Sequence, residues 1–404
     1  MIIHPVEMVA GEESVRLSAR IEFEAGDAPD IDTLWYEFWG CDETFFSRGA
    51  DGFATALLLL AMARGEDLRV RGVLSSRLLQ GLTEYQRVFH AWFPERFNPV
   101  AIECEGLRAA SPGDVPPGVG AAFSGGVDSS CTLLSHLPSD VEGARGEIDY
   151  ALFIHGMDIP LHDEQTFAVA AQRYHAQLRA LGVRLLTART NVRRFVDVLP
   201  WELTHGTALG SVALMLDRLL GRFYIPASFP YTELAPWGSH PLTDPLMSTD
   251  TLEVIHDGCA PRVEKIISVA SWPPARSWLR VCWERPDALQ NCCRCYKCVL
   301  TMVSLDIAGQ LADCVTFPEA LERPRIRGLR LPEEELSETE TIIARAEAAG
   351  RHDLAADLRA ALRASRRRLA LVGLRRRIRA LGRAMSRRRR PRSSGRSCAG
   401  PGTS

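Results

Sequence analysis

The segment 124–130, which reads SGGVDSS and is here called the Gly-Gly loop, has the residue types of an anion-binding turn. It lies between a short apolar run that ends at Phe123 and a helix-like run that begins at Cys131. Two glycines let the backbone turn sharply, so that successive N–H groups point at one anion, and the start of a helix adds partial positive charge. The serines add hydroxyl donors, and Asp128 suits such a site when Mg²⁺ accompanies the anion, which favours a nucleotide polyphosphate. The residues expected to contact it are Ser124, Gly125, Gly126, Val127, Asp128, Ser129 and Ser130.

An ordinary Gly-Gly turn with a helix-capping serine is the alternative for this segment. Two other phosphate motifs are excluded. The chain has no G-x-x-x-x-G-K-[ST] string, so the loop is not a Walker loop. Gly118 and Gly120 precede the strand, and Phe123 stands where a dinucleotide fingerprint has its third glycine.

A cysteine cluster forms the second candidate site. Three cysteines make a C-x2-C-x2-C group, and a fourth lies ten residues earlier. Four thiolates suit a tetrahedral Zn²⁺ ion with bonds of about 2.3 Å, and such a closed site is structural. An iron–sulfur cluster is the alternative, although Met302 stands where the ferredoxin run has its next cysteine; a metal-free cluster is the third. Cys293 is a fifth thiol that we do not expect to bind. The candidate ligands are Cys282, Cys292, Cys295 and Cys298.

The Gly-Gly loop resembles the pyrophosphate loop of the ATP pyrophosphatases, or PP-loop enzymes. The order of the loop, T-D-P-L at 243–246, E-K-I-I at 264–267 and the cysteines is similar to that of the 7-cyano-7-deazaguanine synthases, over about residues 119–303. The resemblance implies that the loop holds the β- and γ-phosphates of ATP, while a substrate oxygen attacks the α-phosphate and nitrogen or sulfur then displaces the adenylate.

The chain also departs from those synthases. They carry Y-G-Q-x-H after the second strand, where this chain has H-G-M-D at 155–158, and their P-x-R-N stretch is T-H-G-T at 204–207. Because these regions shape the substrate pockets, the resemblance implies shared ATP chemistry and zinc architecture, with a different substrate.

Five further side chains are candidates, and all but Asp158 have a plain structural alternative. Lys265 could neutralise phosphate, or it could be a surface lysine. His240 and Asp244 could transfer protons or bind substrate, or they could stabilise a turn. His205 could face the nucleotide, or it could cap or pack. Asp158 could hold ribose or Mg²⁺.

The elements that position these residues read as repeated strand–helix units from residue 120 onward. Strands are expected at 148–155, 183–187 and 223–226. Helices are expected at 163–181, capped by Asp163, and at 207–220, closed by Gly221. Such repeats predict an α/β fold with a doubly wound parallel sheet, which binds ligands at the carboxyl ends of its strands. The resemblance implies that this sheet is PP-loop or HUP-like. The expected domains are 1–115 (α+β, with a strand at 15–23 and helices at 51–63 and 78–93), 116–316 (PP-loop and zinc), 317–365 (helical extension, with a helix or helix pair at 333–363) and 366–404 (Arg-rich tail, helical and partly disordered).

The composition and charge of the chain indicate its cellular compartment and the partners of its tail. The chain has 404 residues and a net charge of −2, but residues 366–396 contain fourteen arginines and no acid follows Asp357, so an acidic body precedes a basic tail. No apolar run approaches the roughly 20 residues that span a bilayer, and no secretory signal is visible, so we expect a cytoplasmic protein whose cysteines are thiols or metal ligands. The tail could be merely solvated, could bind RNA phosphates, or could lie on anionic lipid.

These observations lead us to expect an ATP-dependent ligase that uses ATP, Mg²⁺ and Zn²⁺. It would adenylate an oxygen of a small-molecule acceptor, and a nitrogen nucleophile, free or supplied by a partner, would displace AMP. A homo-oligomer is also expected. The alternatives are a sulfurtransferase acting on a tRNA base, with Cys131, Cys259, Cys293 or Cys314 as the reactive thiol, and a non-catalytic zinc-stapled module that binds nucleotide or RNA.

Overall fold

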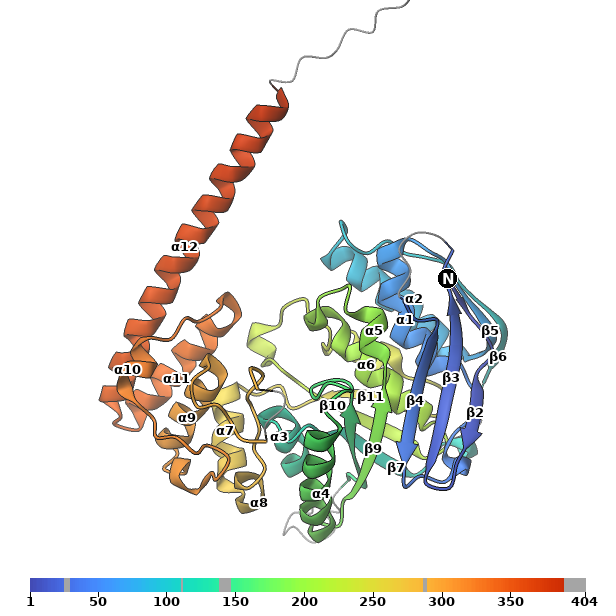
Figure 1. The fold of residues 1–404 in the computed structure, drawn as a ribbon, viewed down its shortest axis with the longest axis horizontal. Coiled ribbons are helices and arrows are strands. Elements are labelled where there is room, and N and C mark those ends of the chain that lie inside the picture. Colours follow the sequence, from blue (N-terminus) through green and yellow to red (C-terminus); the bar gives the residue numbers. More distant parts are fainter. Residues whose placement is uncertain (25–29, 110–111, 138–146, 286–288, 389–404) are drawn as a thin grey trace, which may run out of the picture. The chain divides into compact units, whose positions relative to one another are not determined.

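The computed structural model describes residues 1–24, 30–109, 112–137, 147–285 and 289–388 (Figure 1). The chain divides into two compact units, Met1–Leu321 and Glu322–Ser404. Among the described residues, no helix has both the length and the apolar character that crossing a membrane requires.

The described part of the first unit is built on an eleven-stranded sheet, most of whose pairings are parallel. The strand order is β11-β10-β7-β8-β9-β4-β3-β1-β5-β6, with β2 paired to β3. The strands are β1 (Ile2–Ile3), β2 (Glu7–Ala10), β3 (Ser14–Glu22), β4 (Thr33–Trp39), β5 (Leu68–Ser75), β6 (Ile102–Arg108), β7 (Gly118–Ala122), β8 (Tyr150–His155), β9 (Arg184–Thr190), β10 (Leu220–Pro226) and β11 (Glu253–Asp257).

The five strands from β7 to β11 are parallel and doubly wound. The chain runs from β7 outward to β8 and β9 on one side, then returns to place β10 and β11 on the other side of β7. The winding direction therefore reverses between β7 and β10. In open α/β sheets, ligands bind in the crevice at the carboxyl ends of the strands where this reversal occurs.

Alternating residues of these strands enter two separate apolar clusters. In β8, Leu152 and Ile154 belong to one cluster, and Ala151 and Phe153 belong to the other. This period of two shows that both faces of the sheet are covered. Residues of α1 (Asp51–Arg64), α2 (Ser76–Trp92), α5 (Val192–Val196) and α6 (Trp201–Met215) join the first cluster. Residues of α3 (Val127–Ser135), α4 (Glu164–Ala180), α7 (Arg262–Ser271) and α9 (Tyr296–Ile307) join the second.

The N-terminal strands belong to this same sheet. Strand β4 pairs antiparallel with β9, with Tyr36 opposite Thr190, and the two lie side by side in Figure 1. The Tyr36 hydroxyl also donates a buried hydrogen bond of 3.0 Å to Ser211 Oγ in α6. The structure thus places residues 1–115 in one unit with the strands that follow, instead of in a domain of their own. Pairing between strands so distant in the sequence leaves no local pattern.

Several expected elements are found with small shifts, and one was misplaced. Helix α1 and strand β3 match the expected ranges 51–63 and 15–23 closely. The helix expected at 207–220 is instead α6, which begins after Pro200 and ends at Met215, so that Gly221 lies inside β10. Gly221 is required there for close packing, since a Cβ on it would lie 2.1 Å from the carbonyl oxygen of Pro116.

The second unit is helical, as expected from the sequence. It contains α10 (Arg323–Arg327), α11 (Leu336–Ala348) and α12 (His352–Arg388). The buried Asp357 of α12 accepts hydrogen bonds from Arg323 and Arg327 of α10, and these two guanidinium groups lower its pKa. Helix α12 continues past this packed part as far as Arg388, with Leu371 exposed. The expected tail is therefore helical over 366–388, and 389–404 lies outside the described residues.

Candidate functional site

The Gly-Gly loop lies at the carboxyl end of β7, beside the point where the winding of the sheet reverses. Gly126 is the N-cap of α3, and no side chain caps the helix there. Gly125 has φ of +71°, a conformation that side-chain-bearing residues rarely adopt. A Cβ on Gly125 would also lie 2.3 Å from Tyr174 Oη, so both the backbone and its surroundings demand glycine.

The serine hydroxyls of the loop bond mainly to the loop itself. Ser129 Oγ accepts the N–H of Ser124 at 3.3 Å and donates to the carbonyl of Gly126 at 3.3 Å. Ser124 Oγ accepts the N–H of Gly126 at 3.3 Å. These bonds are long for N–H···O and O–H···O contacts. They can be exchanged at small cost for shorter, charge-assisted bonds to phosphate oxygens.

Asp128, in the first turn of α3, forms an ion pair with Lys265 of α7. The Lys265 ammonium lies 3.0 Å from one carboxylate oxygen, and the Arg262 guanidinium lies 3.0 Å from the other. Lys265 is almost fully buried, with a side chain 1 % exposed, and it also donates to the carbonyl of Ala227 at the end of β10. Lys265 is therefore no surface lysine: it joins the ends of β10 and α7 to the Gly-Gly loop.

The electrostatics of Asp128 follow from these partners. Burial raises the pKa of its carboxyl, but the charges of Lys265 and Arg262 outweigh burial and hold the pKa below its ordinary value. Asp128 is thus ionised at neutral pH, and two cations share one carboxylate. Lys265 acts on a second carboxyl as well, because burial raises the pKa of Asp257 while bonding to His136 and the charge of Lys265 lower it. The two cations thus lie at the start of a helix, where an anion is favoured.

Asp244 is the centre of a second polar group. Its buried carboxylate accepts hydrogen bonds from Ser239 Oγ at 2.6 Å, from the N–H of His240 at 3.1 Å and from His256 Nδ1 at 2.7 Å. Because a carboxylate only accepts, Nδ1 of His256 carries the hydrogen of this bond, and the other ring nitrogen takes no part in it. That atom, Nε2, is buried and has no hydrogen-bond partner among the described residues.

His240 and His205 lie near this carboxylate without bonding to it through their rings. Burial lowers the pKa of His205, and the charge of Asp244 opposes the shift. Burial and the charge of His256 lower the pKa of His240, again against Asp244. His205 Nδ1 faces the carbonyl of Trp201 at 3.2 Å, so its ring is held by its own helix. Neither of the two predicted histidines bonds to Asp244 through its ring. The ring that bonds to Asp244 is that of His256, which the sequence analysis did not predict.

Electrostatic couplings place the remaining candidates around the same edge. Asp158 is exposed after β8. Burial raises the pKa of Tyr174 and the charge of Asp158 adds to this rise, while the same charge opposes the burial that lowers the pKa of His205. Cys259 follows β11, and the charges of both Lys265 and Asp244 act on the pKa of its thiol. The structure therefore gathers the predicted residues from β7, β8, α6, α7 and the β10–β11 connection at the carboxyl edge of the sheet.

The β10–β11 connection packs tightly against the first turns of α6. A Cβ on Gly206 would lie 1.9 Å from the carbonyl oxygen of Gly238, and a Cβ on Gly238 would lie 2.7 Å from His205 Nδ1. Such close approaches admit only glycine. They fix Asp244 and His256 relative to His205.

The four predicted cysteine ligands come together in one buried group. The sulfur atoms of Cys282, Cys292, Cys295 and Cys298 all lie within 4.8 Å of one another, and Cys292 Sγ is 3.7 Å from Cys298 Sγ. A tetrahedron with metal–sulfur bonds of about 2.3 Å has sulfur–sulfur separations near 3.8 Å. The spacing therefore fits a single tetrahedral ion such as Zn²⁺. Cys293 lies outside the group, and its Sγ contacts the carbonyl of Asn291 at 3.5 Å.

Backbone N–H donors and the close spacing of the four sulfur atoms both favour a bound cation. The N–H of Cys295 donates to Cys292 Sγ at 3.2 Å, and the N–H of Cys298 donates to Cys295 Sγ at 3.4 Å. Bonding to Cys295, burial and the charges of the neighbouring sulfurs raise the pKa of Cys298 far above its ordinary value. Four thiolates cannot remain this close without a cation to offset their repulsion.

Asn291, which directly precedes Cys292, links the later three cysteines of the group to the segment that ends at Cys282. Its Oδ1 accepts the N–H groups of Val281 at 2.8 Å and Cys282 at 3.1 Å, and its Nδ2 donates to the carbonyls of Leu279 at 2.9 Å and Thr316 at 3.2 Å. All four hydrogen bonds of the amide are thereby satisfied in a buried position. The sequence analysis missed this residue; its place directly before Cys292 was the only signal.

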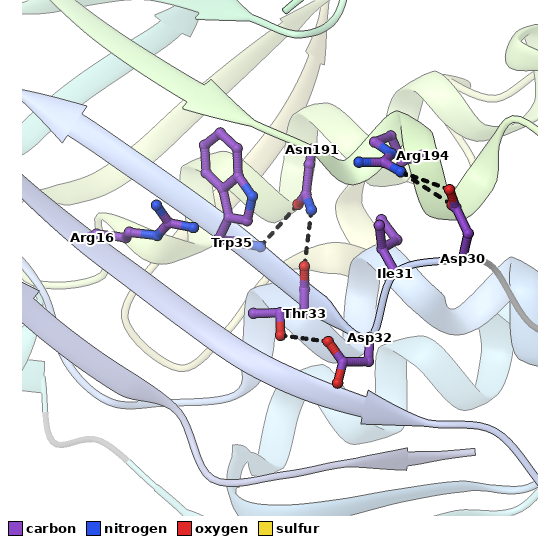
Figure 2. Close-up of a pocket in the computed structure, with 8 residues that line it drawn as sticks. All are labelled: Arg16, Asp30, Ile31, Asp32, Thr33, Trp35, Asn191 and Arg194. Atoms are coloured by element: carbon purple, nitrogen blue, oxygen red, sulfur yellow. Dashed lines mark hydrogen bonds and ion pairs between the residues drawn. The ribbon is translucent and has the colours of Figure 1, made fainter.

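A hollow of about 510 Å³ lies elsewhere in the first unit (Figure 2). It opens beside β4 and α5, where Asn191 bonds to the backbone of both Trp35 and Thr33, and Arg194 forms an ion pair of 3.1 Å with Asp30. None of the predicted site residues lines it. Its lining is Arg16, Asp30, Ile31, Asp32, Thr33, Trp35, Asn191 and Arg194.

Sequence reasoning also missed Arg262 and Trp278. Arg262 opens α7 three residues before Lys265, and this helical spacing could have placed both cations on one face. Trp278 donates from its indole nitrogen to Ser130 Oγ at 3.1 Å, a contact with no signal in the sequence.

Comparisons with protein-family models, with curated proteins and with solved structures found no match to this chain.

Proposed function

We propose that this protein is a PP-loop ATP pyrophosphatase of the ligase type. The observation that carries the proposal is the Asp128–Lys265–Arg262 group beside the Gly-Gly loop, at the carboxyl edge where the sheet reverses its winding. A turn with glycines, unmet helix N–H groups and two cations is suited to a polyphosphate. The resemblance to the PP-loop enzymes supplies the reaction type.

The proposed first step is adenylation. An acceptor oxygen attacks the α-phosphorus of ATP, a new P–O bond forms, and the bond to the β-phosphate oxygen breaks so that pyrophosphate leaves with the electron pair. Lys265, Arg262 and the loop N–H groups stabilise the charge that develops on pyrophosphate. With the two cations turned to phosphate, Asp128 would be the residue that holds Mg²⁺, which would supply further positive charge beside the phosphates.

The proposed second step uses the Asp244–His256 pair. A nitrogen nucleophile attacks the adenylated carbon, a C–N bond forms, and the C–O bond to AMP breaks. Nε2 of His256 is placed to take the proton from nitrogen, because Nδ1 is held by Asp244. Motion of the β10–β11 connection is required to open this buried atom to a substrate.

The cysteine group is proposed to hold Zn²⁺, which would supply structural stability and no bond-making step. None of the ten cysteines in the described ranges forms a disulfide, which agrees with a reducing, cytoplasmic setting. An ammonia-supplying partner, self-association, and RNA or anionic lipid at the tail stay proposals.

Sulfur transfer to a tRNA base is the second candidate, and Cys259 is the observation that favours it. This thiol is partly exposed at the carboxyl edge, whereas Cys131, Cys293 and Cys314 are buried. Burial nevertheless raises the pKa of Cys259, which works against a thiolate nucleophile. Retention of activity in Cys259→Ser would exclude this thiol as the sulfur carrier.

The proposal is tested by following ATP with phosphorus NMR in the presence of small carboxylates, modified purines or tRNA. We expect AMP and pyrophosphate with one of these acceptors. Asp128→Asn should lose this activity, whereas Asp197→Asn, which alters a surface carboxylate paired with Arg193, should keep it. ADP and orthophosphate as the products would contradict the proposal.

A further inference from the structure

A short segment joins the cysteine group to the Gly-Gly loop. Residues 278–282, here called the strap, follow α8 (Pro273–Arg276) and end at the first cysteine ligand. The described residues between 277 and 295 belong to no helix or strand. The course of the strap is therefore set by its contacts at each end and not by secondary structure of its own.

At one end, the strap bonds directly to the Gly-Gly loop and to α3. The N–H of Arg280 donates to the carbonyl of Gly125 at 2.9 Å, and the indole N–H of Trp278 donates to Ser130 Oγ at 3.1 Å. Trp278 is 1 % exposed and Ser130 is fully buried, so water cannot replace this bond. A Cβ on Gly126 would lie 3.6 Å from the carbonyl oxygen of Arg280, which shows how closely the two segments run.

At the other end, the strap is held by the cysteine group. Cys282 is two residues beyond Arg280, and Asn291 accepts the N–H groups of Val281 and Cys282 while it donates to the carbonyl of Leu279. A metal ion that draws Cys282 to the other three sulfurs would fix this end.

We propose that metal binding at the four cysteines orders the Gly-Gly loop through the strap, and so sets the affinity of that loop for the phosphates of ATP. Trp278 and Arg280 are positioning residues, since they act through Ser130 and Gly125. The affinity part rests on the proposed function; the ordering of the loop does not.

The first test removes the metal with a chelator under reducing conditions and measures hydrogen exchange in the full chain. Amides of residues 119–131 should exchange about tenfold faster in the stripped protein. Residues 51–64, which lie in the other apolar cluster, serve as the internal control and should not change. Equal exchange at 119–131 with and without metal, while the cysteine segment itself opens, would overturn the coupling.

The second test keeps the metal and changes one bond. Trp278→Phe removes the indole donor and should weaken binding of MgATP about fivefold, with metal content and exchange at 51–64 unchanged. Trp283→Phe is the matched control, because Trp283 is 57 % exposed and contacts Tyr296, not the loop. Unchanged affinity in Trp278→Phe would overturn the positioning role. Failure of the metal-loaded wild-type protein to bind MgATP would instead overturn the proposed function and the affinity part with it, while the exchange result decides the coupling.

Discussion

The two partners of the Asp128–Lys265 ion pair are expected to respond very differently to substitution. The Lys265 side chain is 1 % exposed, whereas that of Asp128 is 25 % exposed and keeps Arg262 as a second partner. Asp128→Ala leaves a buried ammonium whose remaining hydrogen bond among the described residues goes to the carbonyl of Ala227, and its charge still lowers the pKa of Asp257 against the effect of burial. Lys265→Met leaves a carboxylate that still has a cation and access to water.

The burial of the two side chains determines how much stability each substitution should cost. Removing one partner of a buried ion pair costs about 3–5 kcal/mol when the other is left uncompensated. We therefore expect Asp128→Ala to lower the free energy of unfolding by about 3 kcal/mol. Lys265→Met should cost only about 1 kcal/mol, because the Asp128 carboxylate that remains is partly exposed and keeps Arg262 as a partner. The double variant should be more stable than Asp128→Ala alone, since it removes the buried charge.

The assay is urea unfolding at pH 7, followed by near-ultraviolet circular dichroism, for the wild-type protein and the three variants. A larger loss for Lys265→Met than for Asp128→Ala, or simple additivity in the double variant, would refute the reasoning. The first result would mean that Lys265 is not the buried member of the pair, and the second that the two groups do not interact.

Three further predictions concern the first unit. Burial raises the pKa of Asp51 to about 6, so the folded state binds the proton more tightly than the unfolded state, and the contribution of Asp51 to stability is lost as the pH rises from about 4 to about 6. Relative to Asp51→Asn, the wild-type protein should lose about 3 kcal/mol of unfolding free energy over that window in urea unfolding, and a pH-independent difference would contradict this. Asn291→Ala, which breaks four buried hydrogen bonds, should weaken zinc binding by about 10–100-fold in competition with a chelating dye, whereas Cys293→Ser should leave the stoichiometry at one ion per chain. Gly125→Ala should abolish ATP binding in calorimetry because its Cβ would overlap Tyr174, and wild-type affinity in this variant would show that the loop does not bind the nucleotide.

Local patterns in the sequence predicted the elements that carry the site. The Gly-Gly string between an apolar run and a helix-like run placed the loop between β7 and α3, as the structure has it. Asp163 was expected to cap a helix, and it does so by accepting the N–H of Thr166 at 3.1 Å. The cysteine spacing identified all four members of the buried group. In each case the chemistry depends on residues close together in the sequence.

Contacts between distant segments could not be predicted in this way. Strand β4 completes the sheet against β9 across about 150 residues, and neither strand shows a signal for its partner. The His256 ring reaches Asp244 because β11 and the connection before it fold against each other. Lys265 was proposed from chemistry alone, and only the fold shows that it meets Asp128. Gly221 misled the analysis, because a glycine needed for close packing inside a strand looks the same as one that ends a helix.

The most direct test of the account is a crystal structure of the protein with Mg²⁺ and an ATP analogue whose α–β bridge is a methylene group. We expect the β- and γ-phosphates to lie against the backbone N–H groups of residues 124–127, with Lys265 and Arg262 turned from Asp128 toward them and the α-phosphorus open to the crevice. A nucleotide bound elsewhere, with the Asp128–Lys265 pair intact and the Gly-Gly loop empty, would contradict the account.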